Sequence, residues 1–338
     1  MDAPTLEDAA GDGVVTPERL LVRAPNWIGD VVLSLPALRD LKRNFPRARL
    51  AVLARPWVAR LYEAIHEVDE IVESRGLRAD ARALRGRFDA GVLFTNSFGS
   101  ALGLAWAGIP ERWGYATEGR GPLLTRRARP PAAVRGRSQV YYYRAMLGGV
   151  GLRVSASPDA ALRCPDAWAQ SAALLTGDGP LVGVSPGAAY GSAKRWPVVR
   201  YAAAAGQIAR QRGARVVILG AETERPLADA IGAALPAPAL DLCGRTTLPE
   251  LLGVLSRLEL LVTGDSGPMH LASALGTPLI AIFGPTDWRE TAPAGPARQR
   301  LVREAVECAP CMLRECPIDH RCMTRVGVER IVEEARRL

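Results

Sequence analysis

Short runs of β-branched and other apolar residues alternate with longer amphipathic or alanine-rich stretches along most of the chain. Strands that are separated by helices pair in parallel, because the chain must cross back over the sheet between them. This alternation constrains the fold more than any other feature of the sequence. It predicts an α/β fold in which helices cover parallel sheets.

The alternation runs through two cycles, and 338 residues suit two domains of about 150 to 170 residues each. In the first cycle we expect strands at 19–23, 49–54, 68–73 and 89–95, and helices at 30–44 and ending near 108. In the second we expect strands at 181–185, 215–219, 258–263 and 278–283, and helices at 198–212, 224–235, 248–256 and 268–275. Residues 153–179 are rich in Ser, Pro, Gly and Ala, which favours a junction. The expected division is a flexible tail (1–18), two doubly wound Rossmann-like domains (19–165 and 166–323) and a C-terminal helix (324–338).

Composition limits the classes of protein to which the chain can belong. Hydrophobic residues make up 48% and charged residues 23%, which is typical of a globular protein and excludes a disordered or fibrous one. The N-terminus has no secretion-signal pattern, and the long uncharged run after Asp89 contains too many polar residues for a membrane span. The formal charge is +8, and Lys42 and Lys194 are the only lysines. This arginine excess favours an anionic partner, or reflects genomic base composition.

The first candidate loop runs from Arg23 to Asp30, between a predicted strand and a predicted helix. A carboxylate at or beside a helix N-terminus is stabilised by the helix dipole and by unpaired amides. Asp30 is therefore interpreted as an N-cap, with Gly29 supplying a tight turn. A cap at the carboxyl end of a strand is also where a general base would face a cleft, so the two interpretations are compatible.

The second candidate loop, Ser185 to Pro197, also joins a strand to a helix. Gly187 and Gly191 would leave room for backbone amides to approach a phosphate, and Lys194 would supply a positive charge. The loop matches neither common nucleotide fingerprint. A surface lysine before a proline-started helix is the alternative interpretation.

The third candidate loop, Thr263 to His270, follows an apolar strand. Ser266 and Gly267 would expose amides at a helix start, which is a natural seat for pyrophosphate. Asp265 can accept from sugar hydroxyls or cap the helix. His270 lies one turn further on and could reach the same anion, or could be a core residue.

Two further segments allow several interpretations. Cys308, Cys311, Cys316 and Cys322, with His320, could form a closed structural zinc site or remain free or reversibly paired thiols. The stretch from Arg112 to Arg163 holds ten arginines with interleaved aromatic residues. It could be a solvated face, a surface for an anionic acceptor or membrane leaflet, or a nucleic-acid groove.

Together, the three loops in this order resemble the ADP-heptose:lipopolysaccharide heptosyltransferases of glycosyltransferase family 9, and most closely their heptosyltransferase II branch. The resemblance covers the chain from about Leu20 onward. The motifs that carry it are Asn26-Trp-Ile-Gly-Asp30 with Leu35-Pro36, Ser185-Pro-Gly187 with Lys194-Arg-Trp-Pro197, Asp265-Ser-Gly-Pro-Met-His270, Phe283-Gly-Pro-Thr286, and the cysteine-rich tail.

The resemblance implies a GT-B architecture, in which two Rossmann-like domains face a cleft, with the acceptor bound by the first and ADP-heptose by the second. It implies an inverting, metal-independent transfer of heptose to the inner core of lipopolysaccharide, with no cofactor. Asp30 matches the catalytic base and Lys194 the lysine that meets the donor phosphates. The other residues that match are assigned to the donor (Ser185, Gly187, Glu222, Asp265, Ser266, Gly267, His270) or to the acceptor (Asn26, Trp27, Gly29).

The expected partners are ADP-heptose, the lipid A–core acceptor and the anionic inner face of the inner membrane, for a cytoplasmic, monomeric enzyme that binds no nucleic acid. Three other functions stay open. One is a heptosyltransferase I-like enzyme, another is a different nucleotide-sugar transferase or epimerase of GT-B fold, and the third is a nucleic-acid-binding module.

Overall fold

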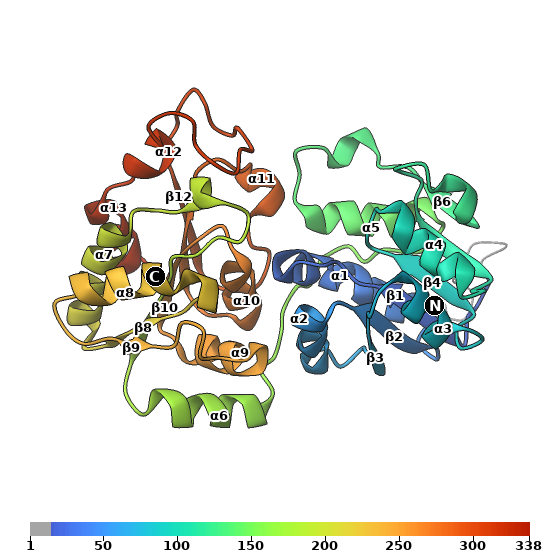
Figure 1. Ribbon diagram of the computed structural model, residues 1–338, viewed down its shortest axis with the longest axis horizontal. Coiled ribbons are helices and arrows are strands. Elements are labelled where there is room, and N and C mark those ends of the chain that lie inside the picture. Colours follow the sequence, from blue (N-terminus) through green and yellow to red (C-terminus); the bar gives the residue numbers. More distant parts are fainter. Residues whose placement is uncertain (1–14) are drawn as a thin grey trace, which may run out of the picture. The chain divides into compact units, whose positions relative to one another are not determined.

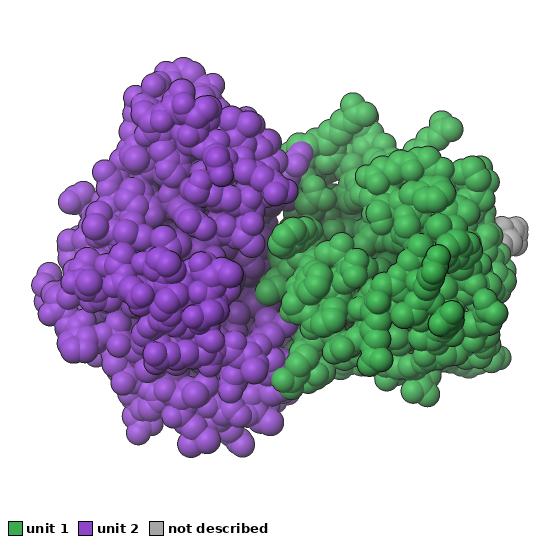
Figure 2. Space-filling view, viewed as in Figure 1, with its two compact units in different colours: residues 1–160 green, residues 161–338 purple. Residues whose placement is uncertain are grey.

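The computed structural model describes residues 15–338, so the expected tail at 1–18 lies mostly outside the described residues. The chain divides into two compact units, residues 1–160 and residues 161–338 (Figure 2). Each unit contains one six-stranded sheet, and every strand pair in both sheets is parallel (Figure 1). The predicted α/β fold with two Rossmann-like sheets is confirmed.

Unit 1 places its first strand in the middle of the sheet, in the order β3-β2-β1-β4-β5-β6. The strands are β1 (Arg19–Arg23), β2 (Arg49–Ala54), β3 (Glu70–Glu73), β4 (Ala90–Leu93), β5 (Glu111–Tyr115) and β6 (Arg126–Ala128). The helices are α1 (Ile28–Asn44), α2 (Pro56–Ala59), α3 (Leu77–Leu84), α4 (Phe98–Trp106) and α5 (Gln139–Gly149), with 3₁₀ turns η2 (Arg60–Ala64), η3 (Gly121–Leu123) and η4 (Ala132–Val134). Apolar side chains of α3 and α4 pack on the sheet, and α1 packs against α5.

Unit 2 repeats this topology, with the order β12-β11-β10-β7-β8-β9. The strands are β7 (Leu181–Ser185), β8 (Arg215–Ile218), β9 (Leu240–Asp241), β10 (Leu260–Gly264), β11 (Leu279–Phe283) and β12 (Gln299–Arg303). The helices are α6 (Asp166–Thr176), α7 (Val198–Arg212), α8 (Arg225–Ala234), α9 (Leu248–Arg257), α10 (Gly267–Leu275), α11 (Trp288–Thr291), α12 (Arg321–Thr324) and α13 (Val328–Arg336), with 3₁₀ turns η5 (Ser192–Lys194) and η6 (Glu222–Glu224). One core joins β7, β8, β10, β11 and β12 to α7, α8 and α13.

Local patterning sets several of these boundaries. The predicted strands at 19–23, 49–54 and 181–185 and the predicted helix at 198–212 have the observed limits. The stretch at 153–179, however, is not irregular throughout, because it contains α6, which packs against α9 in unit 2. None of the helices among residues 15–338 is long and apolar enough to cross a membrane.

Candidate functional site

In unit 2, the loops that follow β7 and β10 meet at the carboxyl edge of the sheet. These two strands are neighbours, and Thr263 pairs in register with Ser185. The Thr263 hydroxyl donates to the Ser185 carbonyl oxygen at 3.2 Å and lies 3.1 Å from the Ser266 hydroxyl. Parallel sheets bind ligands beyond this edge, so the two loops lie where a ligand site is expected.

Lys194 and Asp265 form the centre of this cluster. The Lys194 ammonium lies 2.6 Å from Asp265 Oδ2, and both side chains are almost buried, with exposed fractions of 11% and 4%. The same carboxylate oxygen accepts from the Thr286 hydroxyl at 2.7 Å and from the Thr291 hydroxyl at 3.3 Å. The two threonine hydroxyls therefore fix Asp265, and Asp265 in turn holds Lys194 at the strand ends.

The helix α10 begins at Gly267, two residues after Asp265. Its N-cap is Ser266, whose side chain makes no capping hydrogen bond to the helix. The first amides of a helix have no partner within the helix, and the helix dipole favours negative charge there. The start of α10, with Gly267 as its first residue, can therefore accept an anion beside Lys194.

His270 lies inside α10 and is 4% exposed, and its Nδ1 has no hydrogen-bond partner within the described chain. Burial lowers the pKa of His270 to about 4, even though the negative charge of Asp265 opposes the shift. The imidazole is therefore neutral near pH 7. It can contribute a hydrogen bond to this cluster but no positive charge.

The cysteine-rich tail holds the Lys194 loop in place. Ala193 donates to the Arg314 carbonyl oxygen at 3.0 Å, and His320 Nε2 lies 2.6 Å from the Ala193 carbonyl oxygen. The Tyr190 ring contacts two cations, with Lys194 Nζ 4.8 Å and the Arg314 guanidinium 5.4 Å from its centre. Sequence reasoning missed Tyr190 and Arg314, since nothing in the loop indicates this contact with a segment 120 residues away.

The glycines of this loop have a different role from the predicted one. A side chain at Gly187 would collide with the Glu224 carboxylate, and one at Gly191 with the Arg314 backbone. At Gly191 the neighbouring atoms are backbone, so that position requires glycine, whereas at Gly187 they are the end of a flexible side chain that can move. Glu222 lies on the loop after β8, and its carboxylate packs against Gly244 instead of joining the Lys194–Asp265 cluster.

In unit 1, the start of α1 shows that Asp30 is not the N-cap that the sequence predicts. The helix starts at Ile28, its N-cap is Trp27, and the Val31 amide donates to the Trp27 carbonyl oxygen at 2.9 Å. Asp30 is the third helical residue and is not the cap, and Gly29 lies inside the helix without a positive φ. Asp30 is half-buried near Tyr143, whose pKa is raised mainly by burial and also by the charge of Asp30.

Asn26 ties this loop to the next one. Its carbonyl oxygen accepts from the Trp57 indole at 2.8 Å, and its side-chain oxygen accepts from Arg23 at 3.4 Å. Trp27 and Trp57 are each 59% exposed, so two indoles lie on the surface at the ends of β1 and β2.

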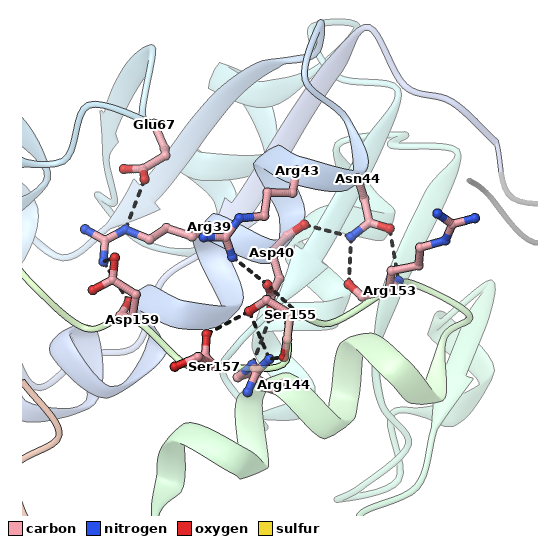
Figure 3. A network of polar contacts seen from close by, with 10 residues as sticks. All are labelled: Arg39, Asp40, Arg43, Asn44, Glu67, Arg144, Arg153, Ser155, Ser157 and Asp159. Carbon is pink, nitrogen blue, oxygen red and sulfur yellow. Dashed lines mark hydrogen bonds and ion pairs between the residues drawn. The ribbon is translucent and has the colours of Figure 1, made fainter. Parts of the chain in front are cut away.

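A buried network holds α1 in position (Figure 3). The Asp40 carboxylate accepts from Arg144 Nε of α5 at 2.9 Å, from Arg43 at 3.0 Å and from the Ser155 amide at 3.1 Å. Asn44 also bonds to the backbone of Arg153. The helix that carries Asp30 is thereby tied to α5 and to the last segment of unit 1.

The arginine-rich stretch is not simply a solvated face. Arg120 is fully buried and Arg144 is 6% exposed. Arg120 donates to the carbonyl oxygens of Tyr115 and Thr95, and Arg112 donates to those of Leu123, Ile109 and Pro110. Several of the ten arginines therefore organise loops that lack regular structure.

The tail cysteines are all free thiols. Cys322 is buried, and its pKa rises to about 11 through burial and the neighbouring Cys308, Cys316 and Cys311, which keeps it protonated. Within residues 15–338, no three His, Cys, Asp or Glu side chains are placed to hold a metal ion. The zinc interpretation therefore has no support from this geometry.

Comparisons with known proteins identify the relatives of this chain. The model of glycosyltransferase family 9 (heptosyltransferase) matches residues 77–321. Lipopolysaccharide heptosyltransferase 2 of Escherichia coli K12 is 32% identical over 84% of this chain and 88% of its own length, and the Salmonella typhimurium enzyme is 33% identical with the same coverage. The solved structure of E. coli ADP-heptose lps heptosyltransferase II superposes with a TM-score of 0.82 at 28% identity, covering 94% of this chain and 98% of that one. This chain is therefore a glycosyltransferase and belongs to glycosyltransferase family 9, as its sequence motifs predict.

Proposed function

We propose that the protein transfers L-glycero-D-manno-heptose from ADP-heptose to the inner core of lipopolysaccharide, with inversion at the anomeric carbon. The observation that carries the proposal is the Lys194–Asp265 pair at the uncapped start of α10, at the edge where a parallel sheet binds its ligand. The relatives named as lipopolysaccharide heptosyltransferase 2, which match most of the chain, support the same substrate class.

On the donor side, negative charge accumulates on ADP as the glycosidic bond breaks. The Lys194 ammonium and the amides of Gly267 and Met269, on either side of Pro268 at the start of α10, can stabilise that charge without a divalent ion. Thr286 and Thr291 fix Asp265 and thereby keep the lysine in position before the donor arrives. Ser185, Gly187 and His270 would complete the wall of the donor site, and Glu222 would contact the donor from the loop after β8.

On the acceptor side, a sugar hydroxyl is a poor nucleophile, so a base must take its proton as the new bond forms. Asp30 is the candidate, because it lies in the first turn of α1 at the carboxyl edge of the sheet of unit 1. A single base suffices for one inverting displacement, unlike the paired carboxylates of a glycosidase. Asn26, Trp27 and Gly29 would contact the acceptor beside it.

The proposed acceptor is a lipid, so we also propose that the protein works at the cytoplasmic face of the inner membrane. We further propose that it does so as a monomer. The exposed Trp27, Trp57 and Phe98 of unit 1, together with its arginines, support contact with an anionic leaflet.

The test is a transfer assay with ADP-heptose and heptosyl-Kdo-lipid A, comparing wild type with Asp30→Asn. Turnover should fall by about 10² to 10⁴-fold, while ADP binding stays within twofold. Near-normal turnover by a folded Asp30→Asn protein would remove Asp30 from the mechanism. An absence of heptose transfer by wild type, with another nucleotide sugar consumed instead, would refute the proposed substrate.

A further inference from the structure

A cavity of about 200 Å³ lies in unit 1 at the carboxyl ends of β1, β2, β3 and β4. Its lining includes Arg23, Arg55, Ser74, Asp80 and Thr95, and it reaches the start of α4 at Ser97 and Ser100. We call it the Arg23 pocket. Asn26, a proposed acceptor contact, lies on its wall.

Arg23 is a buried cation whose direct partners are all neutral. It is 6% exposed and donates to the carbonyl oxygens of Leu53 at 2.9 Å and Ala24 at 3.2 Å, and to the Asn26 side-chain oxygen at 3.4 Å. No carboxylate of residues 15–338 forms an ion pair with it. Burying a charge without a counter-charge costs several kcal/mol, and the carbonyl and amide oxygens around Arg23 offset only part of this cost.

The second guanidinium in the pocket makes this imbalance larger. Arg55 lines the same cavity and contacts the Trp57 ring at 5.9 Å rather than a carboxylate. Burial lowers the pKa of Arg23, and the positive charge of Arg55 lowers it further. Two like charges therefore share one small pocket.

The carboxylate in the pocket wall is already engaged. Asp80 accepts from the Ser74 hydroxyl at 2.6 Å and from the Arg75 amide at 2.7 Å, which fixes the loop after β3. Asp80 raises the pKa of Arg23 by its charge, but it is not in ion-pair contact with the arginine. The pocket thus keeps a net positive charge.

A further feature of the pocket is the hydroxyl of Thr95, one of its lining residues. The Thr95 hydroxyl is buried and has no hydrogen-bond partner among the described residues. The backbone oxygen of Thr95 accepts from the buried Arg120, which fixes the strand end that carries the hydroxyl. Buried polar groups nearly always have partners, so an ordered water or a ligand atom would complete this one.

We propose that the Arg23 pocket binds an anionic group of the sugar acceptor, a carboxylate or a phosphate, through Arg23 and Arg55 with Thr95 as a third donor. Planar guanidinium groups match these anions by paired hydrogen bonds. Binding there would neutralise the two cations and satisfy the hydroxyl. It would also orient the acceptor beside Asn26, on the loop that leads to Asp30. The identity of the ligand as an acceptor rests on the proposed function, whereas anion binding by the pocket does not.

Binding is measured by calorimetry on the full chain saturated with ADP, so that the donor site cannot take up the probes. The probes are free Kdo for the carboxylate, its methyl ester as the neutral counterpart, and inorganic phosphate. Wild type should bind Kdo or phosphate, and the methyl ester at least tenfold more weakly than Kdo if the carboxylate is recognised. Phosphate binding without Kdo binding would assign the pocket to a phosphorylated acceptor. No saturable binding of either anion, or equal binding of Kdo and its ester without phosphate binding, would overturn the proposal.

Variants assign the binding to this pocket. Arg55→Gln should weaken anion binding about tenfold or more, because a charge-assisted hydrogen bond is lost without disturbing the backbone contacts of Arg23. Thr95→Val should weaken it severalfold at nearly constant side-chain volume. Arg82→Gln, an exposed position on α3, is the matched control and should leave binding unchanged. Equal affinities in all four proteins would refute the assignment.

Transfer kinetics separate this proposal from the proposed function. Arg55→Gln should raise the acceptor KM about tenfold, while kcat and the ADP-heptose KM stay within twofold. An unchanged acceptor KM in an enzyme that transfers heptose normally would refute the pocket alone. Failure of wild type to transfer heptose would refute the function, and the calorimetric result would still stand.

Discussion

Replacing Asp40 with Asn should destabilise the packing of α1 against α5 more than other single changes at polar residues of unit 1. The Asp40 side chain is 1% exposed, and that of its partner Arg144 is 7% exposed. Asn keeps the shape of Asp but loses its charge, and its amide group directs hydrogen-bond donors at a site that already receives three. The substitution therefore leaves a buried guanidinium without its counter-charge.

Removing one partner of a buried ion pair costs about 3 to 5 kcal/mol. We expect the lower end of that range, because Arg144 also donates to the backbone and hydroxyl oxygens of Ser155, and these bonds remain. A domain is stable by only about 5 to 15 kcal/mol in total, so the loss is a large fraction of the stability of unit 1.

Hydrogen exchange measured by mass spectrometry on the full chain gives the free energy of opening for peptides from α1 and α5. The matched control is Asp159→Asn, because Asp159 is 54% exposed in its ion pair with Arg39 and should change these values by less than about 1 kcal/mol. The double variant Asp40→Leu/Arg144→Met should be more stable than Asp40→Asn, since it leaves no charge unpaired. If exchange in α5 of Asp40→Asn stays within about 0.5 kcal/mol of wild type, the electrostatic reasoning is wrong.

Four further predictions concern unit 2. Lys194→Ala should weaken ADP binding and reduce kcat more strongly, because the negative charge on the phosphates grows in the transition state. ADP titration and steady-state kinetics test this, and a wild-type ADP affinity together with a wild-type kcat would make Lys194 an ordinary surface cation. Thr286→Val removes a donor from Asp265 at nearly constant volume and should cost about 1 kcal/mol of stability in urea unfolding, with weaker ADP binding, whereas stronger ADP binding would contradict a positioning role. Burial lowers the pKa of His270 from its ordinary 6.5 to about 4. Between about pH 4 and pH 6.5 the unfolded chain therefore binds a proton at this histidine that the folded chain does not bind. The contribution of His270 to stability is therefore complete above about pH 6.5, and stability falls by up to about 3 kcal/mol as the pH is lowered to 4. His270→Gln should lack this component, and an identical pH dependence of unfolding in both proteins would refute it. Transfer should survive EDTA with an unchanged melting temperature, and activity that vanishes on chelation and returns with Mg²⁺ would contradict a mechanism based on Lys194 and helix amides.

The sequence alone was sufficient for the α/β class, the two sheets and the limits of the central elements. β1, β2, β7 and α7 could be predicted to the residue because the periods of strands and helices, and the glycines and prolines that end them, act over a few neighbouring residues. The strand-end loops could be located for the same reason. Their motifs also identified the family, which the comparisons confirmed.

The short strands and the elements at the edges of the domains could not be predicted from local sequence patterns. β5, β6, β9 and β12 are short or rich in arginine, so their alternation is weak and their pairing depends on the strands beside them. The helix α6 was missed because its composition resembles that of a linker, and it is stabilised by packing on α9, more than 70 residues further along the chain.

Tertiary structure alone decided which side chains meet and which charges are buried. Asp265 has two partners, Lys194 and Thr286, that lie on different loops. These loops adjoin because β7, β10 and β11 are neighbours in the sheet. Arg23 and Arg120 resemble ordinary surface cations in the sequence, yet folding buries both among carbonyl oxygens. A residue's type and neighbours set its local conformation, but its solvation and its partners depend on segments far away in the chain. The ion pairs and the Arg23 pocket therefore exist only once the sheets have assembled.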